Sequence, residues 1–292
     1  MKRNNPWGED LSHRIEDLAA TPAKQPLPAD AQSAFDALLQ ALEAGEVRAA
    51  ERAEDGSWHA VQWVKRGILL GFRLGHLVEM SVPDGAGPGN RLQFFDKSTY
   101  PLRELTLEDQ VRIVPGGSSI RRGAYVAPGV VCMPPMYVNV GAYVGEGTMI
   151  DSHALVGSCA QVGARVHLSA AAQIGGVLEP IGASPVVIED DVIVGGNCGV
   201  YEGTVVRAKA VLAAGVVLTR GTPVYDLIRE QVYRGTPDKP LEIPPGAVVV
   251  PGARAIKGDW PRAEGLSVQT PIIVKYRDER TDLATTLEAW LR

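Results

Sequence analysis

The sequence is poor in aromatic residues and in cysteines. Aromatic side chains make up 6% of its 292 residues, whereas glycine occurs 32 times and proline 21 times. This composition predicts a fold with many turns rather than a core of bulky rings. The three cysteines, Cys132, Cys159 and Cys198, form no Cys-x-x-Cys motif, and their number leaves one unpaired. We therefore expect no disulfide framework and a reducing compartment.

Long apolar runs and an excess of positive charge are also missing. No segment approaches the roughly 18 apolar residues of a membrane span, and the N-terminal residues MKRNNPWGEDLSHR lack the apolar core of a signal peptide. The formal net charge of −5 gives no global attraction to nucleic acid. The sequence carries no Walker, Rossmann or metal-cluster motif, so no tightly bound cofactor or metal is expected. We predict a cytoplasmic protein with neither a membrane nor a nucleic-acid partner.

Residues 1–110 are predicted to form a mixed α/β N-terminal domain. Apolar residues recur at helical spacing before Gly45, and an Asp-Gly pair between two short apolar segments indicates a hairpin. One apolar segment fits a helix and a strand equally well. The expected elements are helices over Glu9–Ala20 and Ala31–Ala44, hairpin strands over Val47–Arg52 and Ser57–Val61, a helix or strand over Gln62–Leu74, and a loop over Pro83–Gly89.

From Val114 onward an apolar residue, nearly always branched, recurs at every sixth position. Eleven consecutive positions fit, the phase slips by two residues within Gly175–Val187, and seven more positions fit. About one residue in four is Val, Ile or Leu in ordinary proteins, so chance does not explain the series. The positions are Val114, Ile120, Val126, Cys132, Val138, Val144, Ile150, Val156, Val162, Leu168 and Ile174, then Ile188, Val194, Val200, Val206, Leu212, Leu218 and Val224.

A period of six fits neither the 3.6 residues of a helical turn nor the alternation of a strand. It is typical of a hexapeptide parallel β-helix, in which three repeats make one coil and the branched side chains point inward. Another glycine-rich all-β fold is the alternative. Glycines such as Gly123 and Gly129 are expected at the corners, where a side chain would crowd the turn.

The pattern predicts about six coils and a mainly β chain in three parts. These are the N-terminal domain over 1–110, a β-helix over 111–257 with an excursion near 226–243, and a C-terminal extension over 258–292. Ile243 and Val249 are expected to begin a last coil. The extension is expected to contain a strand over Ser267–Arg277 and a helix over Asp282–Leu291. The handedness of the coil does not follow from the spacing.

Several segments of the repeat resemble the tetrahydrodipicolinate N-acyltransferases. Three further segments, outside the motifs that the acetyl and succinyl branches share, resemble the succinyltransferases. The first set comprises Arg112–Pro115, Met136–Val144, Glu146–Asp151, Val156–Gly163, Ile174–Pro180, Ser184–Pro185 and Val187–Asp190; the second comprises Gln62–Arg73, Phe95–Lys97 and Pro223–Asp226. The resemblance reaches from about residue 30 to the C-terminus.

This resemblance implies a left-handed β-helix and an acyl-CoA-dependent N-acyltransferase of lysine and diaminopimelate biosynthesis. The implied reaction moves a succinyl group from succinyl-CoA, used as a co-substrate, to tetrahydrodipicolinate and gives N-succinyl-2-amino-6-oxopimelate. Relatives form homotrimers with active sites between neighbouring subunits, so a homotrimer is expected. Acetyl transfer to the same or a related amino-acid acceptor is the alternative. A β-helix without acyltransferase activity is more distant, since only His153 and His167 lie in the repeat to serve a γ-type carbonic anhydrase.

The catalytic prediction rests on two carboxylates and one arginine. Asp151 follows an inward position and is expected to face a groove near the acceptor nitrogen; a turn aspartate bonded to local backbone is the alternative. Arg112 is predicted to bind an acceptor carboxylate, because a guanidinium binds a carboxylate with two hydrogen bonds; a surface salt bridge is the alternative. Glu202 matches a family carboxylate. Some relatives carry another glutamate three residues earlier, where this sequence has Gly199, and this departure leaves the base open.

Coenzyme A requires a groove for pantetheine and cations for its phosphates. We expect close approach at four small residues and phosphate contacts at three cations, namely Gly175, Gly176, Ala213 and Ala214, and Lys209, Arg254 and Lys257. His167 is interpreted as a hydrogen-bonded groove histidine rather than the base. Cys159 is interpreted as a packing residue, because direct attack by the amine requires no nucleophilic thiol.

Overall fold

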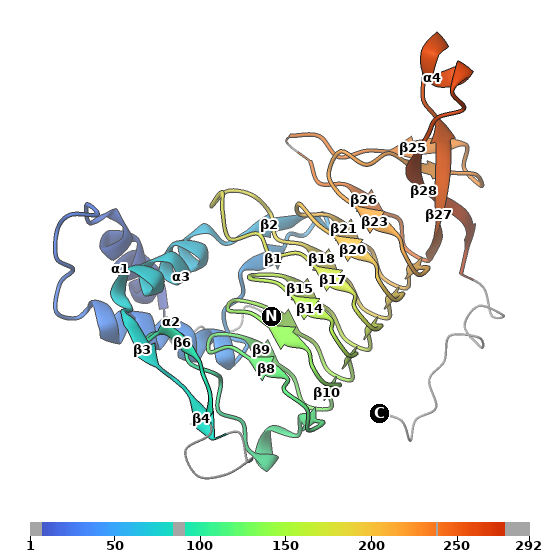
Figure 1. Cartoon of the computed structure of the whole chain (residues 1–292). Coiled ribbons are helices and arrows are strands. Elements are labelled where there is room, and N and C mark those ends of the chain that lie inside the picture. The colour runs from blue at the N-terminus through green and yellow to red at the C-terminus, as the bar shows by residue number, and fades with distance from the viewer. Residues whose placement is uncertain (1–7, 84–90, 238, 278–292) are drawn as a thin grey trace.

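The computed structural model describes residues 8–83, 91–237 and 239–277, and the larger part of this length is a stack of coils (Figure 1). Successive strands visit three parallel sheets in turn. Strand partners in neighbouring coils are three repeats apart, as Val138 and Val156 are. The parallel β-helix predicted from the six-residue period is confirmed, and its parallel sheets are consistent with the left-handed coil that the resemblance implies.

The three sheets meet at three edges of the stack. Sheet 1 contains β7 (Arg112–Ile113), β10 (Val131–Cys132), β13 (Met149–Ile150), β16 (His167–Leu168), β19 (Ile193–Val194), β22 (Val211–Leu212) and β27 (Ala247–Ala255). Sheet 2 contains β8 (Ser119–Ile120), β11 (Tyr137–Val138), β14 (Leu155–Val156), β17 (Gln173–Ile174), β20 (Gly199–Val200) and β23 (Val217–Leu218). Sheet 3 contains β9 (Tyr125–Val126), β12 (Tyr143–Val144), β15 (Gln161–Val162), β18 (Val187–Ile188), β21 (Val205–Val206) and β26 (Glu242–Ile243). We call the turns after these sheets the first, second and third edge.

The core of the stack consists of the predicted repeat positions. From Ile120 onward each of them is at most 5% exposed. Val114 is wrong as an inward position, because it is half-buried and lies outside the first strand. Cys132 pairs with Ile113 rather than with Val114, three repeats earlier, so the first strand is shifted by one position. Sheets 2 and 3 have six strands each, which agrees with the predicted number of coils.

The phase slip corresponds to an enlarged corner of the second edge. Val162 pairs with Ile188 rather than with Pro180, three repeats later, so the loop 175–186 is longer than a regular corner. Lys65 fastens this loop, because it is fully buried and its Nζ donates hydrogen bonds to the carbonyl oxygens of Ala183 at 2.6 Å and Pro180 at 3.3 Å. Burial lowers the pKa of Lys65. A loop of this size is thereby held against the N-terminal region.

The N-terminal region has the helices and the hairpin that the sequence predicts. The undecided segment is a helix, α3. The elements are α1 (Gly8–Ala20), α2 (Ala31–Glu43), β1 (Ala50–Arg52), β2 (Trp58–Ala60), α3 (Gln62–Leu74), β3 (Leu77–Glu79), β4 (Val82–Pro83), β5 (Arg91–Leu92), β6 (Phe95–Lys97) and the 3₁₀ turn η1 (Leu107–Asp109). Of the predicted loop Pro83–Gly89, residues 84–89 lie outside the described residues.

The three helices cover part of the second edge. Their apolar faces form a second core, separate from that of the coils, to which the β-helix contributes Val140 and Cys159. Gly141 is required at this contact, because a Cβ there would lie 2.7 Å from the Ile68 side chain and its φ is +74°. The N-terminal region therefore seals the second edge along its first coils.

At the far end of the stack the chain leaves the coil pattern and returns to it. β24 (Val224–Asp226) and β25 (Gln231–Tyr233) form an antiparallel hairpin that begins just before the predicted excursion. Ile243 and Val249 are fully buried and begin the last coil, as predicted. β27 then runs past the first edge and pairs with β28 (Ser267–Tyr276), with α4 (Asp259–Ala263) between them (Figure 1).

The C-terminal helix predicted over Asp282–Leu291 lies outside the described residues. The boundaries 1–110, 111–257 and 258–292 and the cytoplasmic location stay predictions. Among the helices of residues 8–83, 91–237 and 239–277, none has the length and apolarity needed to cross a membrane.

Candidate functional site

The first edge brings Asp151 and His167 together. Asp151 follows β13, and His167 lies in β16, the next strand of sheet 1. The carboxylate Oδ2 of Asp151 is 3.6 Å from His167 Nε2, and its Oδ1 accepts a hydrogen bond of 3.2 Å from the Ser152 backbone N–H. Both side chains are partly exposed, at 32% for Asp151 and 20% for His167. Asp151 therefore lies at an open edge, as predicted, and one of its oxygens faces an imidazole.

The interpretation of His167 as a hydrogen-bonded groove histidine is not met at its Nε2. Its Nε2 is buried and has no hydrogen-bond partner within the described part of the chain, and 3.6 Å from Asp151 is too long for a hydrogen bond. A buried polar atom without a partner is uncommon in folded proteins and requires an explanation. The signal was present in the sequence, because a coil of three repeats places His167 beside Met149, in the strand that Asp151 follows.

Arg112 lies on the same sheet as this pair. It belongs to β7, two strands away from Asp151's strand β13, and its side chain is exposed. Neighbouring strands are about 4.8 Å apart, so the backbone of Arg112 is roughly 10 Å from that of Met149 along the stack. An extended arginine side chain covers much of such a distance. The structure thus places Arg112 and Asp151 on one face.

Small residues continue the first edge beyond His167. Successive corners contain Ser169 and Ala170, then Gly195 and Gly196, then Ala213 and Ala214. A Cβ at Gly195 would lie 2.6 Å from the Ala214 backbone nitrogen, so the coils are in close backbone contact there. The predicted pair Ala213 and Ala214 therefore lies on the same edge as Asp151, at the end of a strip without large side chains.

Two of the predicted cations lie further along the chain, in and after the strand that pairs with the end of this strip. Arg254 belongs to the part of β27 that runs past the first edge, and Lys257 is exposed shortly after it. Arg254 Nε is buried and has no hydrogen-bond partner among the described residues. Lys209 is elsewhere, because it forms the third-edge corner after β21, near the Asp191 carboxylate. The structure therefore separates Lys209 from Arg254 and Lys257.

The second edge contains Glu202, Gly175 and Gly176. These residues line a cavity of about 480 Å³ together with Tyr201 and Arg220. The Glu202 carboxylate accepts a hydrogen bond of 3.1 Å from the Arg220 backbone N–H. Because Asp151 follows sheet 1 and Glu202 follows sheet 2, a single chain holds the two predicted catalytic carboxylates on different edges.

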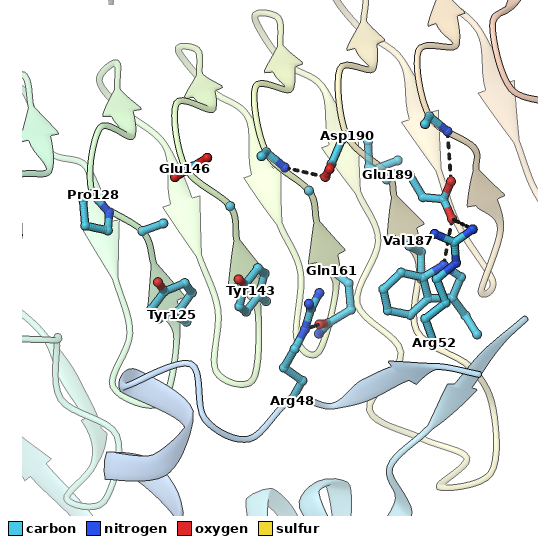
Figure 2. Close-up of a pocket in the computed structure, with 17 residues that line it drawn as sticks. Arg48, Arg52, Tyr125, Pro128, Tyr143, Glu146, Gln161, Val187, Glu189 and Asp190 are labelled. Atoms are coloured by element: carbon cyan, nitrogen blue, oxygen red, sulfur yellow. Dashed lines mark hydrogen bonds and ion pairs between the residues drawn. The ribbon is translucent and has the colours of Figure 1, made fainter. Parts of the chain in front are cut away.

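A further cavity contains none of the predicted site residues. It measures about 580 Å³ and lies between the hairpin β1–β2 and the outer face of sheet 3. Figure 2 shows Tyr125, Tyr143 and Gln161 in a row along the sheet, with Arg48 from the hairpin side beside Gln161 and Arg52 near Glu189. Sequence reasoning missed this cavity, because its two walls come from parts of the chain that are far apart in sequence.

The polar side chains in this cavity bind one another. Arg48 stacks on the Tyr143 ring at 3.7 Å and donates to Gln161 Oε1 at 2.8 Å. Glu189 is 8% exposed and accepts hydrogen bonds from Trp58 Nε1 at 3.0 Å and Arg207 Nη1 at 2.9 Å. Burial opposes ionisation of Glu189, but these hydrogen bonds outweigh it and lower the pKa of the carboxyl. These contacts fasten the hairpin to the β-helix.

The cysteines are packing residues. Burial raises the pKa of the Cys132 and Cys159 thiols to about 12, so neither is a thiolate at neutral pH. All three cysteines are free and buried. Within the residues that the structure describes, no group of three or more His, Cys, Asp or Glu side chains is arranged to hold a metal ion.

Two family models match the chain. Residues 10–74 match the model described as tetrahydrodipicolinate N-succinyltransferase N-terminal, and residues 185–220 match the hexapeptide repeat of succinyl-transferase. A solved structure from Campylobacter jejuni, described as a candidate 2,3,4,5-tetrahydropyridine-2-carboxylate N-succinyltransferase, is 18% identical with a TM-score of 0.45. The match covers 86% of this chain and 64% of that one.

Curated relatives match nearly the whole chain. Three are named 2,3,4,5-tetrahydropyridine-2,6-dicarboxylate N-succinyltransferase. The protein from Polynucleobacter asymbioticus is 43% identical over 91% of both chains, and that from Nitrobacter hamburgensis is 44% identical over 90% of both. The protein from Aromatoleum aromaticum is 41% identical over 97% of this chain and 99% of its own.

The coils and the N-terminal helices together define a hexapeptide-repeat protein of the succinyltransferase type. The identity with the curated relatives over nine-tenths of the chain narrows the class further. The chain belongs to the 2,3,4,5-tetrahydropyridine-2,6-dicarboxylate N-succinyltransferase family.

Proposed function

We propose that this chain transfers the succinyl group of succinyl-CoA to the amino nitrogen of ring-opened tetrahydrodipicolinate, a step of lysine and diaminopimelate biosynthesis. The observation that carries the proposal is the 41–44% identity with succinyltransferases over nine-tenths or more of the chain. The first edge adds an acid–base pair next to a strip of small residues, which suits an amine attacking a thioester. Succinyl-CoA acts as a co-substrate in this reaction, and no metal takes part in the proposed steps.

The Asp151–His167 pair is proposed to accept the proton of the attacking amine. The amine must be neutral when it attacks the thioester carbon, so a base has to remove a proton during the reaction. His167 Nε2 has no hydrogen-bond partner in the described structure, and the Asp151 carboxylate 3.6 Å away stabilises an imidazolium. Catalytic hydrogen bonds are often long before substrates bind and shorten in the complex. The C–N bond then forms and the C–S bond breaks. The coenzyme A sulfur takes the proton back from the pair and leaves as the thiol.

Arg112 is proposed to bind one carboxylate of the acceptor. The acceptor is a dicarboxylate, and Arg112 is exposed on the face that also holds Asp151. A guanidinium orients a carboxylate through two parallel hydrogen bonds. This contact would fix the amine relative to the thioester, which lowers the entropic part of the barrier.

The strip of small residues on the first edge is proposed to bind pantetheine. Ala213 and Ala214 allow close approach of the ligand, and Arg254 and Lys257, in and after the strand that pairs with the end of the strip, are proposed to bind the phosphates. The partnerless Nε of Arg254 in the described structure supports a role in anion binding. Gly175, Gly176 and Lys209 lie on other edges, so they fit this groove only if a neighbouring chain supplies them.

A homotrimer with active sites between its subunits is also proposed, because the predicted site residues lie on different edges of one chain. Asp151 and Glu202 occupy different edges of one chain, and a cyclic assembly can place the first edge of one subunit beside another edge of its neighbour. The chain should then elute and scatter light as three copies. A monomer that is fully active would contradict this arrangement.

The proposed reaction is tested with purified protein, tetrahydrodipicolinate and a series of acyl-CoA donors, following release of the coenzyme A thiol. We expect kcat/KM for succinyl-CoA to exceed that for acetyl-CoA by at least about tenfold, the lower end of the discrimination that a binding pocket achieves. A clear preference for acetyl-CoA would refute the succinyl assignment. No turnover with any donor would refute either tetrahydrodipicolinate as the acceptor or acyl transfer as the activity.

Acyl transfer to a related amino-acid acceptor is the second candidate. The observation behind it is Gly199, where some relatives carry a glutamate. Turnover of a linear 2-amino dicarboxylate at a higher kcat/KM than tetrahydrodipicolinate would support this candidate over the first.

A further inference from the structure

The turn at Tyr201–Gly203 on the second edge differs from the other corners of the coil. At the regular corners with a positive φ, the third residue adopts it, as His153 at +62° and Ala171 at +59° do. In this turn the second residue, Glu202, also has a positive φ of +54°, followed by Gly203 at +73°. Among the described corners, no other non-glycine residue has a positive φ at the second position. A side chain in this region is costly, and such residues concentrate at functional sites.

The ring of Tyr201 lies against two glycines. A Cβ at Gly199 would lie 2.4 Å from Cε2 and 2.8 Å from the hydroxyl oxygen of Tyr201, and a Cβ at Gly175 would lie 2.7 Å from its Cδ1. At these distances a side chain at either position would force the ring to move. The ring therefore folds back from the turn and fills the space that a side chain at position 199 would take.

The contact with the Tyr201 ring explains why position 199 is a glycine. Its φ is not positive, so the backbone there would accept any residue. It is the first residue of β20, on the outer face of sheet 2, between Gln173 and Val217. Every other strand of sheet 2 presents a side chain at the equivalent position, namely Ser119, Tyr137, Leu155, Gln173 and Val217. The Tyr201 ring replaces the missing side chain.

The Tyr201 hydroxyl is available to a ligand. The residue is half-buried, it lines the cavity of about 480 Å³, and its hydroxyl makes no hydrogen bond to another described residue. A phenol carries one hydroxyl hydrogen that it can donate in a hydrogen bond. It can therefore donate to an oxygen that gains negative charge, whereas it cannot act as the base that a carboxylate would be.

We propose that Tyr201 is a catalytic residue of the acyl transfer, and that its hydroxyl donates a hydrogen bond to the thioester carbonyl oxygen. When the amine attacks, the C–N bond forms and the carbonyl π electrons move to this oxygen, where the phenol stabilises the charge and keeps its own proton. Collapse of the intermediate then re-forms the carbonyl and breaks the C–S bond. The amine proton goes to the Asp151–His167 pair and from there to the departing coenzyme A sulfur. Because this pair lies on the first edge and Tyr201 on the second, a neighbouring subunit of the proposed homotrimer supplies the pair. This inference rests on the proposed function.

The decisive variant is Tyr201→Phe, which keeps the ring on Gly175 and Gly199 and removes only the hydroxyl. We expect kcat to fall about 10- to 100-fold, somewhat less than for an enclosed oxyanion donor. The KM for succinyl-CoA and the thermal midpoint should stay near those of the wild type. A kcat within about twofold of wild type would overturn the proposal, because a purely structural ring does not need its hydroxyl.

A second variant tests the contact between the Tyr201 ring and Gly199. In Gly199→Ala the new methyl group would displace the ring, so kcat should fall about as far as in Tyr201→Ala, and the double variant should lose no more than either single one. Gly221→Ala is the matched control, since nothing lies within 4 Å of a Cβ there. Additive losses would contradict the proposed contact. An inactive wild type would instead refute the proposed function, whereas an active wild type with an equally active Tyr201→Phe refutes only the role of Tyr201.

Discussion

The cavity beside sheet 3 and the first edge of the β-helix both gather polar side chains, but they differ in whether those side chains have partners. In the cavity Arg48, Trp58 and Glu189 bind residues of the same chain (Figure 2). At the first edge His167 Nε2 has no hydrogen-bond partner in the described structure. Polar groups that are satisfied within the chain fasten parts of it together, whereas a partnerless group is available to a substrate. The contacts in the cavity beside sheet 3 therefore stabilise the fold, and the open first edge is proposed to carry the catalytic chemistry.

The sharpest test of this contrast is Asp151→Asn. Asparagine keeps the size of the side chain and removes its charge, so the pair with His167 no longer stabilises an imidazolium. We expect kcat to fall by roughly 10²- to 10⁴-fold, the usual contribution of general acid–base catalysis, with an unchanged thermal midpoint. Steady-state kinetics and thermal unfolding measure the two effects. Ser152→Ala, the next residue in the same turn, is the control, and near-normal turnover of Asp151→Asn would contradict the site.

The opposite effect is expected in the cavity. Glu189→Gln removes a buried carboxylate that binds Arg207, Trp58 and the Ala208 N–H. We expect a loss of about 3 kcal/mol in the free energy of unfolding, because Arg207 keeps a buried charge with one partner fewer. Turnover of the folded variant should stay within about twofold. Glu146→Gln is the control on the rim of the cavity, where the side chain is 75% exposed.

The stability difference between the wild type and Glu189→Gln should depend on pH. The pKa of Glu189 is lowered in the folded state, so the unfolded chain takes up the proton first as pH falls. The stabilisation is complete above the unfolded pKa of about 4.3 and disappears as pH falls through the folded value. Urea unfolding between neutral and acidic pH measures this. A difference that stays constant across that range would refute the role of the charge.

Arg112→Ala should weaken acceptor binding. We expect the KM for the acceptor to rise about 10- to 100-fold, which corresponds to the loss of a charge-assisted hydrogen bond of ~1.5–3 kcal/mol. The KM for succinyl-CoA should hardly change. Arg112→Lys should recover only part of the lost acceptor binding, since an ammonium cannot donate the two parallel hydrogen bonds that a planar guanidinium donates to a carboxylate. Equal changes in both KM values would contradict the assignment to the acceptor.

The smallest effect is expected at Cys159, on the sealed second edge. Cys159→Ala should leave kcat and both KM values within about twofold, because burial keeps the thiol protonated and the proposed reaction needs no nucleophile. A stability loss of about 1 kcal/mol is expected, a typical value for a single core substitution. Loss of activity in a stable Cys159→Ala variant would reopen the question of a covalent mechanism.

The sequence by itself determined the coils, because the six-residue pattern that indicates them lies within short segments of the chain. Each inward position recurs after six residues, and from Ile120 to Val224 every predicted one is buried. The one failure, Val114, lies in the first coil, where Arg112 pairs with Val131 and no earlier coil holds the register. The helix α3 remained undecided in the sequence because its segment is apolar on its own, and its type follows from packing against α1 and α2.

Only the tertiary structure decided which groups at the corners are left without partners. The repeat places Asp151, Cys159 and Lys209 at corners of the coil, yet the N-terminal core buries Cys159, Lys209 lies beside Asp191, and Asp151 remains open. The Lys65 contact to the enlarged loop and the Tyr201 ring on Gly199 join residues whose spacing follows no period. A short period fixes where side chains point, but which edge is covered depends on contacts between residues that are far apart in the chain.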